Sequence, residues 1–487
     1  MIEVLSIASE CYPLVKTGGL ADVVGALPKA MAPLGVAMRT LVPGYPSVMG
    51  QMTDVRVAAE LPDFFDGWAK LLWARAGGLD LVVLEAPHLY DRPGNPYVGP
   101  DGADWADNWK RFAALSFAAY ELGRGIADGY RPQLLHCHDW QSGLVPAYVA
   151  FNAPIRSKTI LTVHNLAFQG RFGWDIFPQL RLDHRAANES AIEFYGGISF
   201  LKAGLQCADA LTTVSPTYAH EITTEAYGMG LQGLLQSRAD VLYGITNGID
   251  VAEWNPLTDV ALPATYNAST IHQRLANKAA LAQAFELEEG PGPLFGVVSR
   301  LTWQKGMDML AGCIDEIVAH GGRLAVLGSG EVALEQGFKA AAVRHPGKVG
   351  IVTKYDERLS HLVQGGADVM VIPSRFEPCG LTQLYGLRYG CVPLVSRVGG
   401  LADTVIDANE AAVESGSATG IVFSPATQEA LSHAIRRTIQ LFGRHKVWSK
   451  MQRRGMKSEV SWEASAEKYA DLYHNLLGLK RDDDQND

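Results

Sequence analysis

Short apolar segments rich in β-branched residues alternate with helical stretches along the first half of the chain. The segments predicted as strands are residues 4–8, 37–42, 81–84, 134–137, 159–163 and 210–214. Residues 105–126 form a long amphipathic pattern that predicts a helix, and residues 71–84 predict a hairpin that turns at Gly77-Gly78. Strands alternating with helices in this way are typical of a parallel sheet covered by helices.

The alternation lapses at residues 247–270, a stretch that contains proline and asparagine, and then begins again. The strands predicted after the lapse are residues 294–298, 323–327, 349–352, 369–372 and 392–395. The chain is therefore predicted to be an α/β protein with two Rossmann-like doubly wound domains and a hinge near residues 245–260. Because such sheets bind ligands beyond the carboxyl ends of their strands, two facing sheets predict a deep interdomain cleft.

Composition narrows the possible classes of protein. At roughly 150 residues per domain, the 487 residues are enough for more than one domain. The net charge of −10 argues against a general nucleic-acid or membrane-surface binder. No apolar run approaches the roughly 18 residues of a membrane span, and the N-terminus lacks the basic region of a secretion signal. The cysteines are scattered without a Cys-x-x-Cys pair, which argues against a disulfide framework or a zinc site. A cytoplasmic protein without nucleic-acid or membrane partners is predicted.

A glycine loop, Lys16-Thr17-Gly18-Gly19-Leu20, follows the first predicted strand. Gly18 and Gly19 lack a Cβ atom, so a ligand can approach their backbone N–H groups. Lys16 supplies a mobile cation, and the helix expected to begin near Leu20 directs the positive end of its dipole to the same place. The loop therefore suits a phosphate group. The alternative is a glycine pair that only makes a turn.

Two neighbouring strand candidates end in loops that contain histidine. His136, His138 and Asp139 end one strand, and His164 ends the next. These residue types can bind a metal, but no further cluster completes the set of ligands. A strand end that binds a sugar or nucleotide is the favoured interpretation. Histidines that only form structural hydrogen bonds remain the alternative.

In the second half, Arg300 and Lys305 lie five positions apart on a loop that opens a helix. An arginine fork and a lysine point charge can clamp a diphosphate, although solvated surface cations are the alternative. Gly328-Ser329-Gly330 is a further glycine turn before a helix. It lacks the third glycine of a dinucleotide-binding fingerprint, so it is weak evidence for one.

Residues 374–382 follow another predicted strand. Glu377 is placed to accept hydrogen bonds from sugar hydroxyls, and Gly380 to Thr382 would supply helix-start N–H groups to an anion. Cys379 has no base beside it, which argues against a nucleophilic cysteine.

Together these motifs resemble one family, the bacterial glycogen synthases of the ADP-glucose type, which are related to plant starch synthases. The matching segments are residues 9–23, 136–140, 162–170, 246–250, 299–306, 375–390 and 399–405. The resemblance implies the two-domain GT-B fold. It places an N-terminal domain on the acceptor side at 1–248 and an ADP-glucose-binding domain at 249–456. It also places a helix that packs back onto the N-terminal domain within 457–480, followed by a disordered acidic tail at 481–487.

The reaction implied by this resemblance is transfer of glucose from ADP-glucose to the non-reducing 4-hydroxyl of an α-1,4-glucan, with retention. It implies no metal and no cofactor. Glu377 and His164 would hold the glucose, and Lys16 would contact the nucleotide sugar. Arg300 and Lys305 would neutralise the departing ADP. The other residues implied at the site are Asp139, Gly18, Gly19, Asp22, Asn247, Tyr355 (stacked on adenine), Cys379, Gly380, Leu381 and Thr382.

One position departs from the pattern of related sugar transferases, in which a second glutamate follows the first by eight residues. Here that position is Tyr385, which leaves ribose recognition open. Neither Asp139 nor Glu377 can be assigned as a covalent nucleophile from sequence, so a same-face mechanism is favoured for retention. The alternatives are a phosphorylase-like enzyme with pyridoxal phosphate, a nicotinamide-dependent dehydrogenase and a non-catalytic sugar-binding protein.

Overall fold

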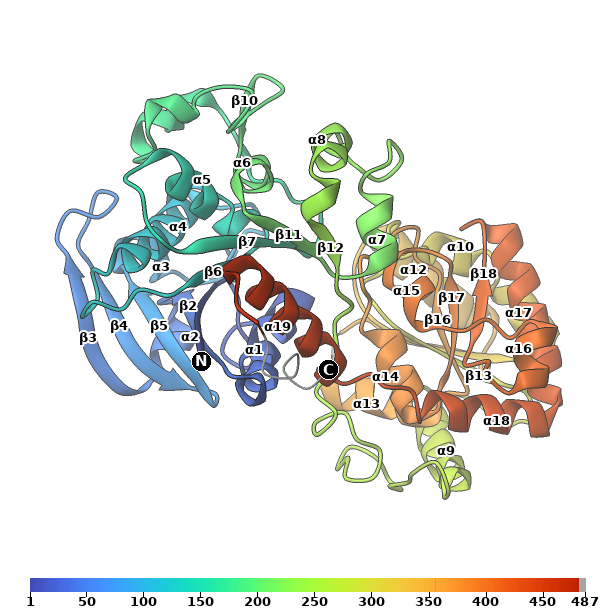
Figure 1. The fold of residues 1–487 in the computed structure, drawn as a ribbon. Coiled ribbons are helices and arrows are strands. Elements are labelled where there is room, and N and C mark those ends of the chain that lie inside the picture. The colour runs from blue at the N-terminus through green and yellow to red at the C-terminus, as the bar shows by residue number, and fades with distance from the viewer. Residues whose placement is uncertain (355, 481–487) are drawn as a thin grey trace. The chain divides into compact units, whose positions relative to one another are not determined.

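The computed structural model describes residues 1–354 and 356–480, and it divides into two compact units. Unit 1 comprises Met1–Asn247 together with the segment that begins at Trp462, and unit 2 comprises Gly248–Ser461 (Figure 1). Tyr355 and the acidic tail at 481–487 lie outside the described residues. None of the described helices is both long and apolar enough to cross a membrane.

Unit 1 is built on a nine-stranded sheet with the order β12-β11-β7-β6-β1-β2-β5-β4-β3. Its strands are β1 (Ile2–Ile7), β2 (Val36–Pro43), β3 (Thr53–Leu61), β4 (Ala69–Ala76), β5 (Leu79–Glu85), β6 (Leu134–His138), β7 (Lys158–Val163), β11 (Ala210–Thr213) and β12 (Leu242–Gly244). All neighbours pair in parallel except those of β4, which is antiparallel to β3 and β5. A separate small sheet contains β8 (Arg171–Phe172), β9 (Glu193–Phe194) and β10 (Gly197–Ser199).

The hairpin predicted at residues 71–84 is confirmed as β4 and β5. Gly77 and Gly78 form its turn with φ of 57° and 79°, angles that glycine adopts without a steric penalty. The sequence pattern did not predict β3, because most of its residues are exposed and give no regular apolar alternation. It also did not predict β12, which has only three residues.

The helices of unit 1 cover its main sheet. They are α1 (Gly19–Met31), α2 (Pro46–Met49), α3 (Pro87–Tyr90), α4 (Asn108–Arg124), α5 (Leu144–Phe151), α6 (Phe200–Cys207), α7 (Pro216–Glu221), α8 (Gln232–Ser237) and α19 (Glu463–Leu477). Short 3-10 helices are η1 (Ala32–Leu34), η2 (Trp140–Ser142), η3 (Trp174–Gln179), η4 (His184–Ala186) and η5 (Ala239–Val241). The predicted helix at 105–126 is confirmed as α4.

Unit 2 contains a six-stranded sheet, all parallel, with the order β15-β14-β13-β16-β17-β18. The strands are β13 (Leu294–Val298), β14 (Arg323–Leu327), β15 (Val349–Val352), β16 (Val369–Ile372), β17 (Val392–Ser396) and β18 (Ile421–Phe423). The helices are η6 (Ile271–Gln273), α9 (Arg274–Ala284), α10 (Met307–Ala311), α11 (Ile314–Ala319), α12 (Val332–Arg344), α13 (Glu357–Gly366), α14 (Thr382–Tyr389), α15 (Gly399–Thr404), α16 (Glu410–Ser415), α17 (Gln428–Gly443) and α18 (His445–Gly455). This strand order is that of a doubly wound Rossmann sheet.

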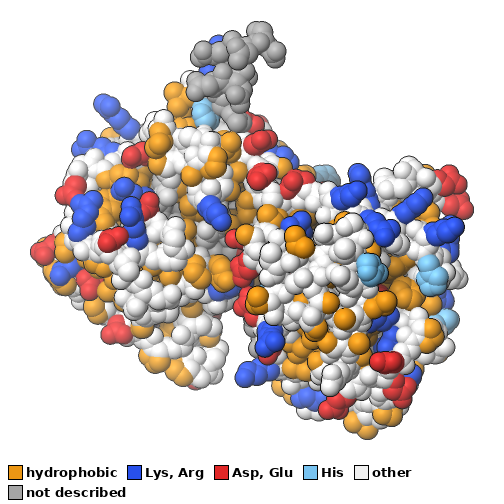
Figure 2. All heavy atoms as spheres, turned by 90° about the horizontal axis from the view of Figure 1, so that it is seen from below, with side chains coloured by type: hydrophobic (Ala, Val, Ile, Leu, Met, Phe, Trp, Pro, Cys, Tyr) orange, Lys and Arg blue, Asp and Glu red, His pale blue; other side chains and the backbone are white. Residues whose placement is uncertain are grey.

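The surface of the chain carries charges of both signs. On the face that Figure 2 shows, basic and acidic side chains are intermixed with uncharged ones. The net charge of −10 is therefore not gathered into one acidic region on that face.

The C-terminal helix α19 belongs to unit 1 and completes one of its cores. Tyr469 and Tyr473 of this helix are buried together with Val23 and Leu27 of α1. Figure 1 shows α19 beside α1. The hydroxyl of Tyr473 also lies 2.7 Å from Nδ1 of His136, on β6. The helix is thus joined to the sheet by apolar burial and by one buried hydrogen bond.

Replacement of Tyr473 by phenylalanine tests the hydrogen bond separately from the packing. The variant keeps the buried ring but leaves Nδ1 of His136 without its partner, so the free energy of unfolding should fall by about 1–2 kcal/mol. Urea denaturation measures the change. Lys468→Ala, which alters an exposed residue of the same helix, is the matched control and should stay close to wild type. Equal stability of all three proteins would contradict a contribution from this bond.

Candidate active site

Both sheets place the predicted site residues at the point where the strand order reverses. In unit 1, β1 lies between β2 and β6, the glycine loop follows β1, and Asp139 follows β6. In unit 2, β13 lies between β14 and β16, the loop with Lys305 follows β13, and Glu377 follows β16. Ligands of doubly wound sheets bind in the crevice at this point.

The N–H groups of the glycine loop face a carboxylate of the protein itself. Glu10 is only 2% exposed, and it accepts hydrogen bonds from the backbone N–H groups of Thr17 and Gly18. It also accepts from Thr17 Oγ1 at 2.6 Å and from the hydroxyl of Tyr97. Sequence reasoning did not identify Glu10, because its spacing from the loop gives no sign that the loop folds back around it.

Lys16 and Asp22 lie together at the start of α1. Lys16 Nζ is 2.8 Å from Asp22 Oδ1 and lies over the ring of Tyr12, 5.2 Å from its centroid. Gly18 caps the helix and a Cβ atom there would meet nothing within 4 Å, so the space in front of the helix is open. Gly19 is the first residue of the helix. A cation and open space therefore lie at the positive end of the helix dipole.

Asp139 and His164 meet where β6 and β7 end. Asp139 has a φ of 54°, and its Oδ1 accepts the backbone N–H of His164 at 2.7 Å and that of Asn165 at 3.4 Å. Burial raises the pKa of Asp139 to about 7, and the nearby charge of Glu10 adds to the shift. Burial lowers the pKa of His164 to about 3, so this imidazole is neutral at physiological pH.

The histidines of β6 take part in a buried hydrogen-bond network. His136 uses both ring nitrogens, one with Tyr473 at 2.7 Å and one with Thr162 at 2.6 Å. His138 does the same, with Ser6 at 3.1 Å and His164 at 3.0 Å. Within the described ranges, no three or more histidine, cysteine or acidic side chains are grouped to hold a metal ion.

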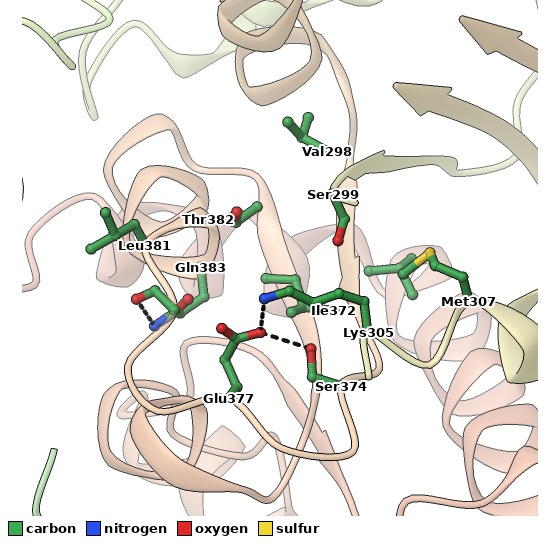
Figure 3. Close-up of a pocket in the computed structure, with 12 residues that line it drawn as sticks. Val298, Ser299, Lys305, Met307, Ile372, Ser374, Glu377, Leu381, Thr382 and Gln383 are labelled. Atoms are coloured by element: carbon green, nitrogen blue, oxygen red, sulfur yellow. Dashed lines mark hydrogen bonds and ion pairs between the residues drawn. The ribbon is translucent and has the colours of Figure 1, made fainter. Parts of the chain in front are cut away.

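In unit 2, the buried Glu377 and the partly buried Lys305 form an ion pair beside a small pocket of about 60 Å³ (Figure 3). Glu377 is 6% exposed, and its Oε2 accepts from Lys305 Nζ at 2.6 Å and from Ser374 Oγ at 2.8 Å. Leu381 and Thr382, at the start of α14, line the same pocket. The structure thus brings together the predicted residues of two loops.

A second ion pair joins Arg375, in the loop of Glu377, to Asp308 of α10, and neither residue lines the pocket. Nη1 and Nη2 of Arg375 each lie 2.7 Å from a carboxylate oxygen of Asp308, and Cζ of Arg375 lies over the ring of Trp303, 4.4 Å from its centroid. Hydrogen bonding from Arg375 holds the pKa of Asp308 below its usual value. Arg300, in contrast, is exposed, and its guanidinium makes no hydrogen bond or ion pair with any described residue.

Glycines allow the loops of unit 2 to approach each other closely. A Cβ atom on Gly399 would lie 2.0 Å from the carbonyl oxygen of Glu377, and one on Gly328 would lie 1.8 Å from that of Ser299. A Cβ on Gly330 would lie 2.2 Å from the carbonyl oxygen of Leu301. The Gly328-x-Gly330 turn therefore packs closely against the backbone of the loop that carries Arg300, and this contact supports the loop.

The remaining predicted residues lie as follows. Asn247 is 7% exposed, and its Oδ1 is buried without a hydrogen-bond partner among the described residues. Cys379 is buried, and Gly380 has a φ of 73°. Tyr385 stacks on the ring of Trp254 with centroids 3.7 Å apart. Tyr355 is not among the described residues.

The raised pKa of Asp139 has a consequence for stability. Its folded pKa of about 7 exceeds the unfolded value near 3.8, so the folded state holds a proton that the unfolded state has lost. The contribution of this group to stability therefore falls as the pH rises through that range.

Asp139→Asn removes this penalty while keeping an oxygen that can accept the same N–H bonds. Its gain in unfolding free energy over wild type should exceed ~1 kcal/mol at pH 8 and be smaller at pH 5. Thermal denaturation at both pH values measures this, with Asp240→Asn, at an exposed position, as control. The same difference at both pH values would show that Asp139 is charged across the range.

Comparison with known proteins identifies the family. The family model described as "Starch synthase catalytic domain" matches residues 3–237, and "Glycosyl transferases group 1" matches residues 281–454. Glycogen synthase of Rhizobium tropici is 55% identical over 98% of this chain and 99% of its own length. Glycogen synthase of Rhodopseudomonas palustris is also 55% identical, over 97% of this chain and 98% of its own length.

Solved structures agree with these matches. The catalytic domain of starch synthase IV from Arabidopsis thaliana, bound to ADP and acarbose, has a TM-score of 0.88 at 30% identity and covers 98% of this chain and 99% of its own. A sucrose-phosphate synthase from Thermosynechococcus elongatus, at 20% identity, has a TM-score of 0.61 and shows the fold alone. These matches favour glycosyl transfer over the phosphorylase-like, dehydrogenase and non-catalytic alternatives. The chain belongs to the glycogen synthase family of glycosyltransferases, with the GT-B fold.

Proposed function

We propose that the chain transfers glucose from ADP-glucose to the non-reducing 4-hydroxyl of an α-1,4-glucan in the cytoplasm, with retention of the anomeric configuration. The glucan acceptor is supported by the name glycogen synthase, which relatives that are 55% identical over nearly the whole chain carry. The ADP bound to the starch synthase IV structure further supports an adenosine donor. In the structure, the observation that carries the proposal is the buried Glu377 carboxylate beside Lys305 at the switch point of unit 2.

Glu377 is proposed to hold the glucose. Lys305 and Ser374 both donate to its Oε2, which leaves Oε1 to accept from a sugar hydroxyl. A carboxylate held in one orientation before the sugar arrives has less conformational freedom to lose on binding. His164 is proposed to hold the glucose from unit 1. Asn247 and Asp139 are proposed to contribute polar groups to the same substrate.

The diphosphate is proposed to be bound by Arg300, Lys305 and Lys16. Negative charge develops on the departing ADP as the glycosidic bond breaks, and cations placed in advance stabilise that charge. The helix-start N–H groups at Gly19 and at Leu381 and Thr382 add to this effect, whereas those of Thr17 and Gly18 bind Glu10. Asp22 of unit 1 and Cys379 to Thr382 of unit 2 are proposed to contact the ADP moiety, and Tyr355 is proposed to stack on adenine.

Retention is proposed to proceed by a same-face mechanism. The two buried carboxylates already bind protein groups, Asp139 through backbone N–H groups and Glu377 through Lys305. A double displacement would need one of them free as a nucleophile on the opposite face of the sugar. In the same-face route, the departing phosphate accepts the proton of the attacking 4-hydroxyl, and the new bond forms where the old one breaks.

The direct test supplies labelled ADP-glucose or UDP-glucose with a glucan primer and measures label in precipitated polymer. Label should come mainly from ADP-glucose and should persist in excess EDTA. Glu377→Gln should lower kcat/KM by about 10- to 150-fold, the equivalent of 1.5–3 kcal/mol for a charged hydrogen bond. Glu414→Gln, at an exposed position of α16, is the control. A wild-type protein that labels no polymer, or an E377Q variant with full activity, would refute the proposal.

Arg300→Ala should lower kcat more than it raises KM, because the cation acts mainly on charge that develops in the transition state. A loss of about tenfold or more in kcat is expected, with an unchanged melting temperature because Arg300 is exposed. Lys446→Ala removes an exposed cation from α18 of the same unit and controls for net charge. A change confined to KM would instead assign Arg300 to ground-state binding.

A further inference from the structure

On one face of the unit 1 sheet, the side chains of two neighbouring strands change from apolar to polar toward the carboxyl ends of the strands. Along β1 this face carries Ile2 and Val4 and then Ser6, and along β6 it carries Leu134 and then His136 and His138. Residues two apart in a strand share a face, so the change occurs in one buried layer. Ser6 is 1% exposed, and both histidines are 0% exposed. Buried polar groups of this kind need partners.

These side chains form a chain of hydrogen bonds that ends at His164. Ser6 Oγ lies 3.1 Å from His138 Nε2, and His138 Nδ1 lies 3.0 Å from His164 Nε2. The rings of His138 and His164 are 5.2 Å apart and tilted by 37°. His164 itself is only half-buried, so its ring joins the buried layer to the accessible strand end.

The hydrogen bonds from Ser6 through His138 leave His164 one free ring nitrogen. Burial lowers the pKa of both imidazoles, so each is neutral and has one N–H donor and one acceptor nitrogen. Whichever nitrogen carries the shared proton, Nε2 of His164 is occupied by His138. Only Nδ1 is left for a ligand. Its role as donor or acceptor is then linked to the direction of the hydrogen bond between Ser6 and His138.

The backbone of His164 is held by the neighbouring residue of the same strand end. Asp139 Oδ1 accepts its N–H at 2.7 Å, and the backbone N–H of Asp139 donates to the carbonyl of Thr162 at 2.9 Å. His138, the last residue of β6, therefore holds the side chain of His164, and Asp139, the next residue, holds its backbone.

We propose that His138, supported by Ser6, is a positioning residue that orients the ring of His164 and presents its Nδ1 to the sugar. The inference rests on the proposed function, in which His164 contacts the glucose. His138 itself touches no substrate. If His138 acts by positioning, its effect on kcat/KM depends on the presence of His164. A general contribution of His138 to folding would not depend on His164.

A double-mutant cycle tests this with the full-length protein, ADP-glucose and a glucan primer. His138→Leu should lower kcat/KM by about tenfold, and Ser6→Ala by a smaller factor. His138→Asn, whose amide can occupy the position of Nδ1, should recover most of the loss. In a His164→Ala background, His138→Leu and Ser6→Ala should each change kcat/KM by less than about twofold, because their target has been removed.

His136→Leu is the matched control, since His136 is buried on the same strand but bonds to Tyr473 and Thr162. It should lower the melting temperature without the selective loss of kcat/KM. The inference is overturned if His138→Leu has no effect on an otherwise wild-type protein, or has the same effect in the His164→Ala background. If His138→Leu does not fold, Ser6→Ala in the wild-type and His164→Ala backgrounds completes the cycle. Full activity of His164→Ala would instead overturn the role of His164 on which the inference rests, and a wild-type protein without glucosyl transfer would refute the proposed function itself.

Discussion

Parallel pairing is the constraint on which the candidate site depends. Strands that run in the same direction end at the same edge of a sheet, so residues far apart in the chain meet there. Ser6 lies opposite His136 in the register of β1 and β6, and His138 lies opposite Thr162 in the register of β6 and β7. A shift of one residue in the β6–β7 pairing would turn His138 away from His164, and a shift in the β1–β6 pairing would turn it away from Ser6.

Three buried carboxylates follow strands of the two sheets, Glu10 and Asp139 in unit 1 and Glu377 in unit 2, and they are accommodated in different ways. Glu10 accepts hydrogen bonds from backbone N–H groups and hydroxyls of two loops, and Glu377 pairs with Lys305. Asp139 has no cation partner among the residues that the structure describes, and its pKa rises because burial disfavours the charged form. A buried charge without partners costs folding free energy, so each carboxylate needs the groups around it to stay in place. The conformation of the surrounding loop is thereby restricted. The glycine loop is fixed by Glu10, whereas the loop of Glu377 is fixed by Lys305.

The return of α19 to unit 1 has a structural reason. Tyr469 and Tyr473 fill a core formed by α1 and the sheet, and Tyr473 bonds to His136 on β6. The last described helix of the chain therefore completes the buried layer to which His138 belongs. Glycines have a comparable function in unit 2, where Gly399 and Gly328 permit backbone contacts that any side chain would prevent.

The sequence by itself determined the fold class, most of the strands and the loops that carry the candidate residues. Short apolar runs of strand length, such as residues 134–137 and 294–298, are typical of strands buried in a parallel sheet, so they predict those strands. The family resemblance assigned roles to Glu377 and His164 on motif grounds, and the comparisons confirm the family. The sequence also marked His136 and His138 as unusual residues in a buried strand, but it did not choose between ligand binding and structural hydrogen bonds.

Only the tertiary structure decided which hydrogen-bond and ion-pair partners the site residues have. Glu10 with Gly18, Lys305 with Glu377, and His138 with His164 are each brought together by pairing or loop packing between distant segments. The periodicity of a segment reflects only residues close to one another in the sequence. It therefore carries no information about which distant segment a residue contacts. β3 was missed for a related reason: its residues are largely exposed, so hydrogen bonding to β4, and not an apolar pattern, makes it a strand.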